Sequence, residues 1–97
     1  MFNDCEEFNC DLSNWNVSKV KNMLGMFFNC TEFVSDISKW DVSKVNYMPS
    51  MFYNCKKFNS DLSKWDISNV ANMISMFDDC DTLIKNNKIP AWYKGKI

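Results

Sequence analysis

The chain has 97 residues, with eleven basic and twelve acidic side chains and a formal net charge of -1 at pH 7. All eleven basic residues are lysine and histidine is absent, which argues against nucleic-acid binding and removes the commonest general base and metal ligand. No apolar run approaches the roughly 20 residues that span a bilayer, and the N-terminus lacks the regions of a signal peptide. We therefore expect one domain that does not insert directly into a membrane.

A word of five letters recurs every 25 residues: MFNDC, MFFNC, MFYNC and MFDDC begin at Met1, Met26, Met51 and Met76. Apolar residues align in columns between these words, which is the signature of units that stack on one another. We expect a single repeat domain over 1–97, made of a partial unit, three repeats and a C-terminal cap. Their boundaries are 1–8, about 9–33, 34–58 and 59–83, and 84–97.

A short strand is predicted first in each unit. The segment DISKWDVSKV at 36–45 is typical, because it is rich in β-branched and aromatic residues and has Ser and Asp at its bends. A helix of about two turns should follow, because four apolar residues have i, i+3, i+4, i+7 spacing. These residues are Met23, Met26, Phe27 and Cys30. Repeated in register, the pattern predicts an α/β right-handed solenoid with one short strand and one short helix per repeat and a parallel sheet.

The register fails near the C-terminus, where Pro90 falls in the column of Trp15. Proline in a central strand removes a hydrogen-bond donor, so 84–97 is predicted to be the last edge and cap of the stack. Trp92 and Tyr93 are expected to close its apolar end.

The repeat follows the pattern F-N-x-D-L-S-x-W-D-V-S-x-V-x-N-M-x-x-M-F-x-x-C over residues 1 to about 83. This pattern resembles the repeat of BspA-like leucine-rich-repeat proteins, in the mycoplasma-type variant found in bacterial surface proteins and lipoproteins. The resemblance implies a leucine-rich-repeat-like solenoid for surface display, adhesion or protein binding, at the cell surface or secreted, without enzymatic activity.

Three columns of candidate ligands are better explained as structure. Cys5, Cys30, Cys55 and Cys80 are expected to lie in the core, because successive packed helices are too far apart for a disulfide between them. A Cys5–Cys10 or intermolecular disulfide and a zinc site remain as alternatives. The acidic columns are expected to accept backbone N–H groups at turns, with calcium binding as the alternative. They consist of Asp11, Asp36 and Asp61, and of Asp41 and Asp66.

The Trp column, Trp15, Trp40 and Trp65, has two interpretations. The rings either stack in the core or form an exposed aromatic strip for sugar or peptide binding, and we favour the core. Polar columns between the apolar ones are predicted to form an interaction ladder on the strand side. Its residues are Lys39, Asp41, Lys44, Lys64, Asp66 and Asn69.

No catalytic constellation is recognisable, because the Ser columns lack a base and the two glycines build no phosphate-binding loop. We therefore expect a non-catalytic protein-interaction or adhesion module without a cofactor. The alternatives are a structural spacer within a larger surface protein and carbohydrate binding through the Trp column. Phe2, Cys5, Phe8 and Leu12 would leave an apolar N-terminal end, so self-association through that end is also expected.

Overall fold

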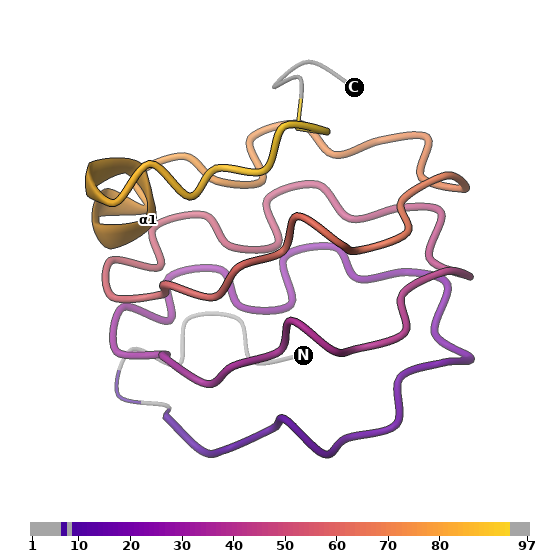
Figure 1. Ribbon diagram of the computed structural model, residues 1–97, viewed down its shortest axis with the longest axis horizontal. Coiled ribbons are helices and arrows are strands. Elements are labelled where there is room, and N and C mark those ends of the chain that lie inside the picture. Colours follow the sequence, from indigo (N-terminus) through magenta and orange to yellow (C-terminus); the bar gives the residue numbers. More distant parts are fainter. Residues whose placement is uncertain (1–6, 8, 94–97) are drawn as a thin grey trace.

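The computed structural model describes residue 7 and residues 9–93, which wind in similar turns stacked on one another (Figure 1). We call each turn a layer, and the described parts of the first, second, third and last layers are 9–25, 26–50, 51–75 and 76–93. Hydrogen bonds join neighbouring layers at a constant offset. Met23 N–H donates to Tyr47 O at 2.7 Å, and Met48 N–H donates to Asn72 O at 2.9 Å.

The expected leucine-rich-repeat-like solenoid, with a strand and a helix in every repeat and a parallel sheet, is wrong. Within residues 7 and 9–93 the only helix is α1, Asp81–Lys85, which lies outside the predicted helical positions. No strand is present in this part of the chain, where pairing is limited to two isolated parallel bridges, Asn22↔Tyr47 and Tyr47↔Asn72. The layers consist almost entirely of turns, so the α/β assignment fails.

The helix predicted at 23–30 is replaced by turns because two of its residues have left-handed backbone conformations. Gly25 has φ 54° and Asn29 has φ 61°, which a right-handed helix does not accommodate. Alternate N–H groups then bond to the next layer instead of within a helix: Phe27 N–H donates to Met51 O at 2.9 Å. The same two positions have positive φ in the following layers, at Ser50, Asn54, Ser75 and Asp79.

The strand predicted at 36–45 is also a series of turns. Trp40 N–H donates to Ile37 O, three residues back, at 3.1 Å. Asp36 Oδ1 accepts from the amide of Ser38, two residues ahead, at 3.0 Å. These local bonds satisfy backbone groups that a sheet would pair between strands, so the side chains join the layers here.

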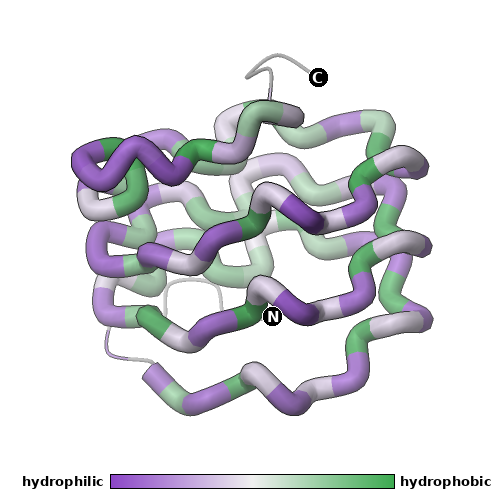
Figure 2. Tube along the Cα trace, viewed as in Figure 1, coloured by the Kyte–Doolittle hydropathy of each residue, from purple (hydrophilic) through white to green (hydrophobic). Residues whose placement is uncertain are grey.

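Aromatic columns fill the core. The rings of Phe27 and Phe52 lie 5.7 Å apart at 10°, and those of Phe52 and Phe77 lie 5.6 Å apart at 8°. Phe33 and Phe58 form a second column, 5.6 Å apart. Hydrophobic residues therefore recur at the same places in successive layers (Figure 2).

The last layer resumes the repeat two residues late, after α1. Trp92 Nε1 donates to Leu62 O at 2.9 Å, across 30 residues, whereas the equivalent bonds of the preceding layers cross 28 residues. Asn86 Nδ2 likewise donates a hydrogen bond to Asn59 Oδ1 of the preceding layer, at 3.0 Å. Trp92 rather than Pro90 thus takes the place of the Trp column, within the segment predicted to be the cap.

Candidate functional site

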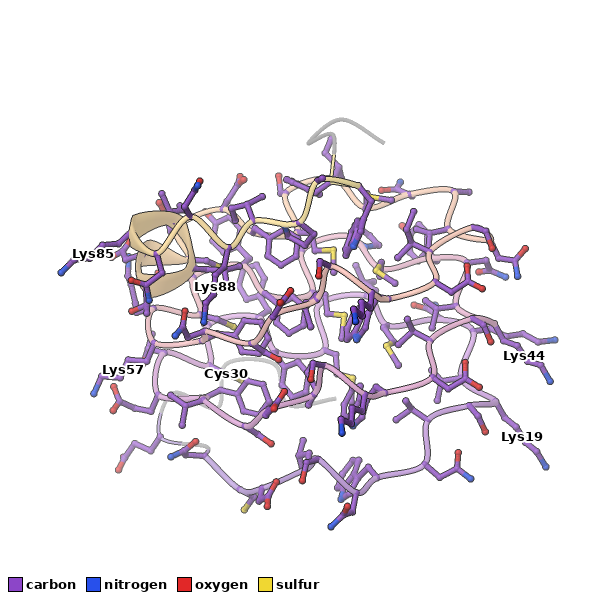
Figure 3. The ribbon with its side chains drawn as sticks, viewed as in Figure 1. Lys19, Cys30, Lys44, Lys57, Lys85 and Lys88 are labelled. Atoms are coloured by element: carbon purple, nitrogen blue, oxygen red, sulfur yellow. The ribbon has the colours of Figure 1, made fainter. Side chains whose placement is uncertain are left out.

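The polar ladder predicted from the sequence lies on the surface. Its members Lys39, Asp41, Lys44, Lys64, Asp66 and Asn69 are all exposed. Lys19 and Lys44 project from one edge of the stack, and Lys57 and Lys85 project from the opposite edge (Figure 3). Of the predicted residues, Lys44 therefore lies at the edge opposite Lys57 and Lys85.

Serine hydroxyls fix the carboxylates of this ladder. Asp41 Oδ1 accepts from Ser43 N–H at 3.0 Å and from the Ser43 hydroxyl at 2.6 Å, and Asp66 makes the same two bonds with Ser68. The serine hydroxyl is the first cause that holds the pKa of both carboxyls below the usual range, followed by the serine amide. Asn69 Nδ2 also bonds Ser43 O at 2.7 Å, which joins two layers. The two carboxylates of the ladder are therefore held in fixed orientations.

The Trp column is mostly internal. Trp40 and Trp65 are 5% and 4% exposed, and their indole N–H groups donate to carbonyls of the preceding layer, Leu12 O and Ile37 O, at 3.0 and 3.1 Å. Trp15 is 45% exposed. Only one of the three rings is thus substantially accessible to a ligand.

An apolar hollow of about 250 Å³ lies at the N-terminal end of the stack. Trp15, Val20 and Met23 line it together with Leu24, which is 55% exposed. Of the residues predicted to make this end apolar, Leu12 is buried, while Phe2, Cys5 and Phe8 lie outside the described residues. Trp15, Val20 and Met23 of this lining belong to the predicted apolar columns, whereas Leu24 does not.

The described cysteines of the repeated column are buried. Cys55 Sγ lies 3.0 Å from Phe27 O, and Cys80 Sγ lies 2.9 Å from Phe52 O, so each thiol contacts the preceding layer. Burial raises the pKa of the Cys80 thiol to about 12, and also raises the pKa of Cys55. Cys30 is buried and Cys10 is exposed, whereas Cys5 is outside the described residues. The described part of the chain holds no group of three or more His, Cys, Asp or Glu side chains placed for a metal.

A serine relay between layers was missed by the sequence analysis. Ser35 Oγ accepts from Leu12 N–H at 2.9 Å and donates to Asp11 Oδ1 at 3.2 Å. Ser60 repeats this arrangement one layer later, with Ile37 N–H at 3.3 Å and Asp36 Oδ1 at 3.0 Å. The available signal was a serine 24 residues after each aspartate. In each relay the serine hydroxyl satisfies the hydrogen-bond donor of a buried amide and orients a carboxylate at the surface.

An exposed apolar strip was missed as well. Leu24, Tyr47 and Ile74 come from three successive layers and are 55%, 37% and 48% exposed. Pro49 lies between Leu24 and Ile74 in the same column, because Gly25 N–H bonds Pro49 O and the next layer repeats this bond. The sequence feature that could have predicted this strip is the apolar column of Leu24, Pro49 and Ile74, which lies outside the predicted core stripe.

A stack of 25-residue layers tied by side-chain hydrogen bonds defines the chain as a repeat protein. The chain belongs to the family described as "Mycoplasma protein of unknown function, DUF285", whose family model matches residues 1–95. The match supports the mycoplasma-type repeat at the level of the family. No curated protein and no solved structure matches the chain. None of the helical structure in the described part has the length and apolar content needed to cross a bilayer.

Proposed function

We propose that the chain is a non-catalytic protein-interaction module that pairs with a second copy of itself through its N-terminal end. The observation that carries the proposal is the apolar hollow beside the exposed side chains of Trp15 and Leu24. Exposed apolar surface with an aromatic ring at its centre is characteristic of protein interfaces. A second copy is the occupant that the repeat itself indicates.

The second layer shows what kind of surface packs against the residues equivalent to those that line the hollow. The counterparts of Trp15, Val20 and Met23 in that layer, which are Trp40, Val45 and Met48, are at most 5% exposed. They are covered by the layer stacked before them, so the surface of each layer is complementary to the apolar face of another layer. An apolar face of the same kind is therefore a suitable cover for the hollow.

The two ends of the stack differ in polarity. The last layer carries exposed charged and polar side chains, namely Asp78, Asp79, Lys85, Asn86 and Asn87. Ile84, which is 55% exposed, is the large hydrophobic side chain that the described part of this layer exposes, and these charged and polar groups lie in the same layer. Pairing of two N-terminal ends, which is isologous and closes as a dimer, is therefore favoured over an open head-to-tail filament.

For a partner other than a second copy, we infer that the polar ladder is the contact surface. Its exposure and its fixed carboxylates support this assignment, because oriented charges favour specificity of association. The proposal extends to adhesion at a cell surface. The support for that extension is the resemblance of the repeat to those of bacterial surface proteins.

Sedimentation velocity over a concentration series tests the proposed pairing. The wild-type chain should shift from monomer to dimer as its concentration rises, and Leu24→Glu should remain a monomer because it places a charge in the apolar contact. Val34→Glu is the matched control, because Val34 is 49% exposed but does not line the hollow. A wild-type chain that is monomeric at every concentration, or a dimer that Leu24→Glu leaves intact, would refute the proposal.

A further inference from the structure

A half-buried aromatic column ends one layer before the stack does. The rings of Phe28 and Tyr53, which lie 25 residues apart in the repeat, are stacked 4.8 Å apart at 8°. The next residue of the column is Asp78, which is exposed. Within residues 7 and 9–93, Tyr53 makes a ring contact with Phe28 alone, so the other face of the Tyr53 ring has no ring stacked on it. The column therefore ends on an open aromatic face.

A hollow of about 400 Å³ adjoins Tyr53. The rest of its lining comes from the last layer and includes the ring of Tyr93 and the aliphatic side chains of Ile84 and Ile89. Ile84 belongs to α1, at one edge of this layer, and is 55% exposed (Figure 1). The hollow thus offers aromatic and aliphatic surface to a ligand, apart from both the N-terminal hollow and the polar ladder.

Two adjacent carboxylates, those of Asp78 and Asp79, give this hollow a negative charge. None of the described lysines lines it. The ion pairs in the described part of the chain involve other carboxylates, one of them that of Asp81, which lies 3.4 Å from Lys56 Nζ. The charge of the hollow is therefore left for a ligand to neutralise, and a cationic ligand is favoured.

We propose that this hollow binds an arginine side chain of another protein, whose guanidinium stacks on the open face of Tyr53 and pairs with Asp78 and Asp79. A guanidinium is planar and weakly hydrated, so it stacks on aromatic rings and forms two parallel hydrogen bonds with a carboxylate, which the ammonium of lysine does not. The aliphatic part of the arginine packs against Ile84. This chain contains no arginine, so the partner differs from the second copy of the proposed pairing.

NMR titration of the full chain, labelled with ¹⁵N, tests the proposal with three blocked tripeptides that carry arginine, lysine or citrulline between two glycines. The arginine peptide should shift the amides of Asp79 and Ile84, with a dissociation constant in the millimolar range. The lysine peptide should bind at least about threefold more weakly, because its ammonium does not stack in the same way. Citrulline has nearly the shape of arginine without the charge, and its peptide should bind at least about tenfold more weakly.

Asp79→Asn tests the contribution of the carboxylates. Asparagine suits this position, because Asn29 and Asn54 are its equivalents in the preceding layers and share its φ of 61°. The variant should therefore fold, and its affinity for the arginine peptide should fall about fivefold or more. Asp81→Asn is the matched control, because Asp81 is exposed, pairs with Lys56 and does not line the hollow. It should change the affinity less than about twofold.

Tyr53→Leu tests the stacking. It should remove the preference for arginine over lysine, because leucine offers no ring to the guanidinium. Tyr47→Leu is its control, since Tyr47 is 37% exposed and does not line the hollow. The proposal is overturned if the arginine peptide shifts none of these amides, if the lysine or citrulline peptide binds as tightly, or if Asp79→Asn or Tyr53→Leu behaves like its control.

Discussion

Replacing Trp40 with phenylalanine tests whether indole hydrogen bonds join the layers. Trp40 is 5% exposed, its Nε1 donates to Leu12 O at 3.0 Å, and its ring lies 6.1 Å from that of Phe27. Phenylalanine keeps an aromatic ring but removes the donor. Leu12 O still accepts from Trp15 N–H at 3.0 Å, so the loss of the indole bond should cost about 0.5–1.5 kcal/mol, and the cavity left by the smaller ring about 1 kcal/mol more.

The expected total of about 1.5–2.5 kcal/mol is a large part of the stability of a domain, which is typically about 5–15 kcal/mol. Trp15→Phe is the control, because Trp15 is 45% exposed and should lose less than about 1 kcal/mol. Urea unfolding followed by far-ultraviolet circular dichroism measures both free energies of unfolding. Equal losses in the two variants, or a loss below about 1 kcal/mol for Trp40→Phe, would show that the indole bond does not hold the layers together.

Three further predictions concern acid, thiols and backbone strain. Five carboxyl groups have a pKa in the folded state below the usual value of 3.8, namely those of Asp11, Asp36, Asp41, Asp61 and Asp66. The stability that they contribute is present near neutral pH and should be lost as the pH falls below about 4. Urea unfolding midpoints measured as a function of pH test this. Mass spectrometry after alkylation of the native chain should find Cys10 labelled and Cys55 and Cys80 protected, because the latter two are buried thiols with a raised pKa; equal labelling would contradict this. Ser50→Gly should raise the free energy of unfolding by about 1 kcal/mol in urea, because Ser50 has φ 55°, and Ser63→Gly should not.

The apolar columns could be predicted from the sequence because burial repeats every 25 residues. Phe27, Phe52 and Cys55 are 0% exposed, as their columns indicated. The helix could not be predicted correctly from the same residues, because i, i+3, i+4 spacing also fits consecutive turns that put every third or fourth side chain inward. The deciding signal was the column of Gly25, Ser50 and Ser75 with its partner column of Asn and Asp, residues that tolerate positive φ.

The prediction of a strand at 36–45 was wrong for a different physical reason. The β-branched and aromatic residues of 36–45 are buried, but serines and aspartates at fixed intervals satisfy the backbone locally. A sheet needs those same N–H groups for pairing between strands, and the local bonds compete with that pairing. The exposure of the ladder residues followed from their polarity, whereas the relay of Ser35 required knowledge of which side chains meet across layers.

Fixed offsets between layers explain why the fold tolerates α1 only near its end. The indole bonds of Trp40 and Trp65 and the thiol contact of Cys55 all cross 28 residues, so an insertion between two full layers would displace every one of them. The two extra residues in the last layer displace only the segment after α1. Trp92 recovers its partner because its long ring reaches Leu62 O, but the short hydroxyl of the relay has no equivalent in the described part of that layer. The break in the serine relay thus coincides with the insertion that ends the regular stack.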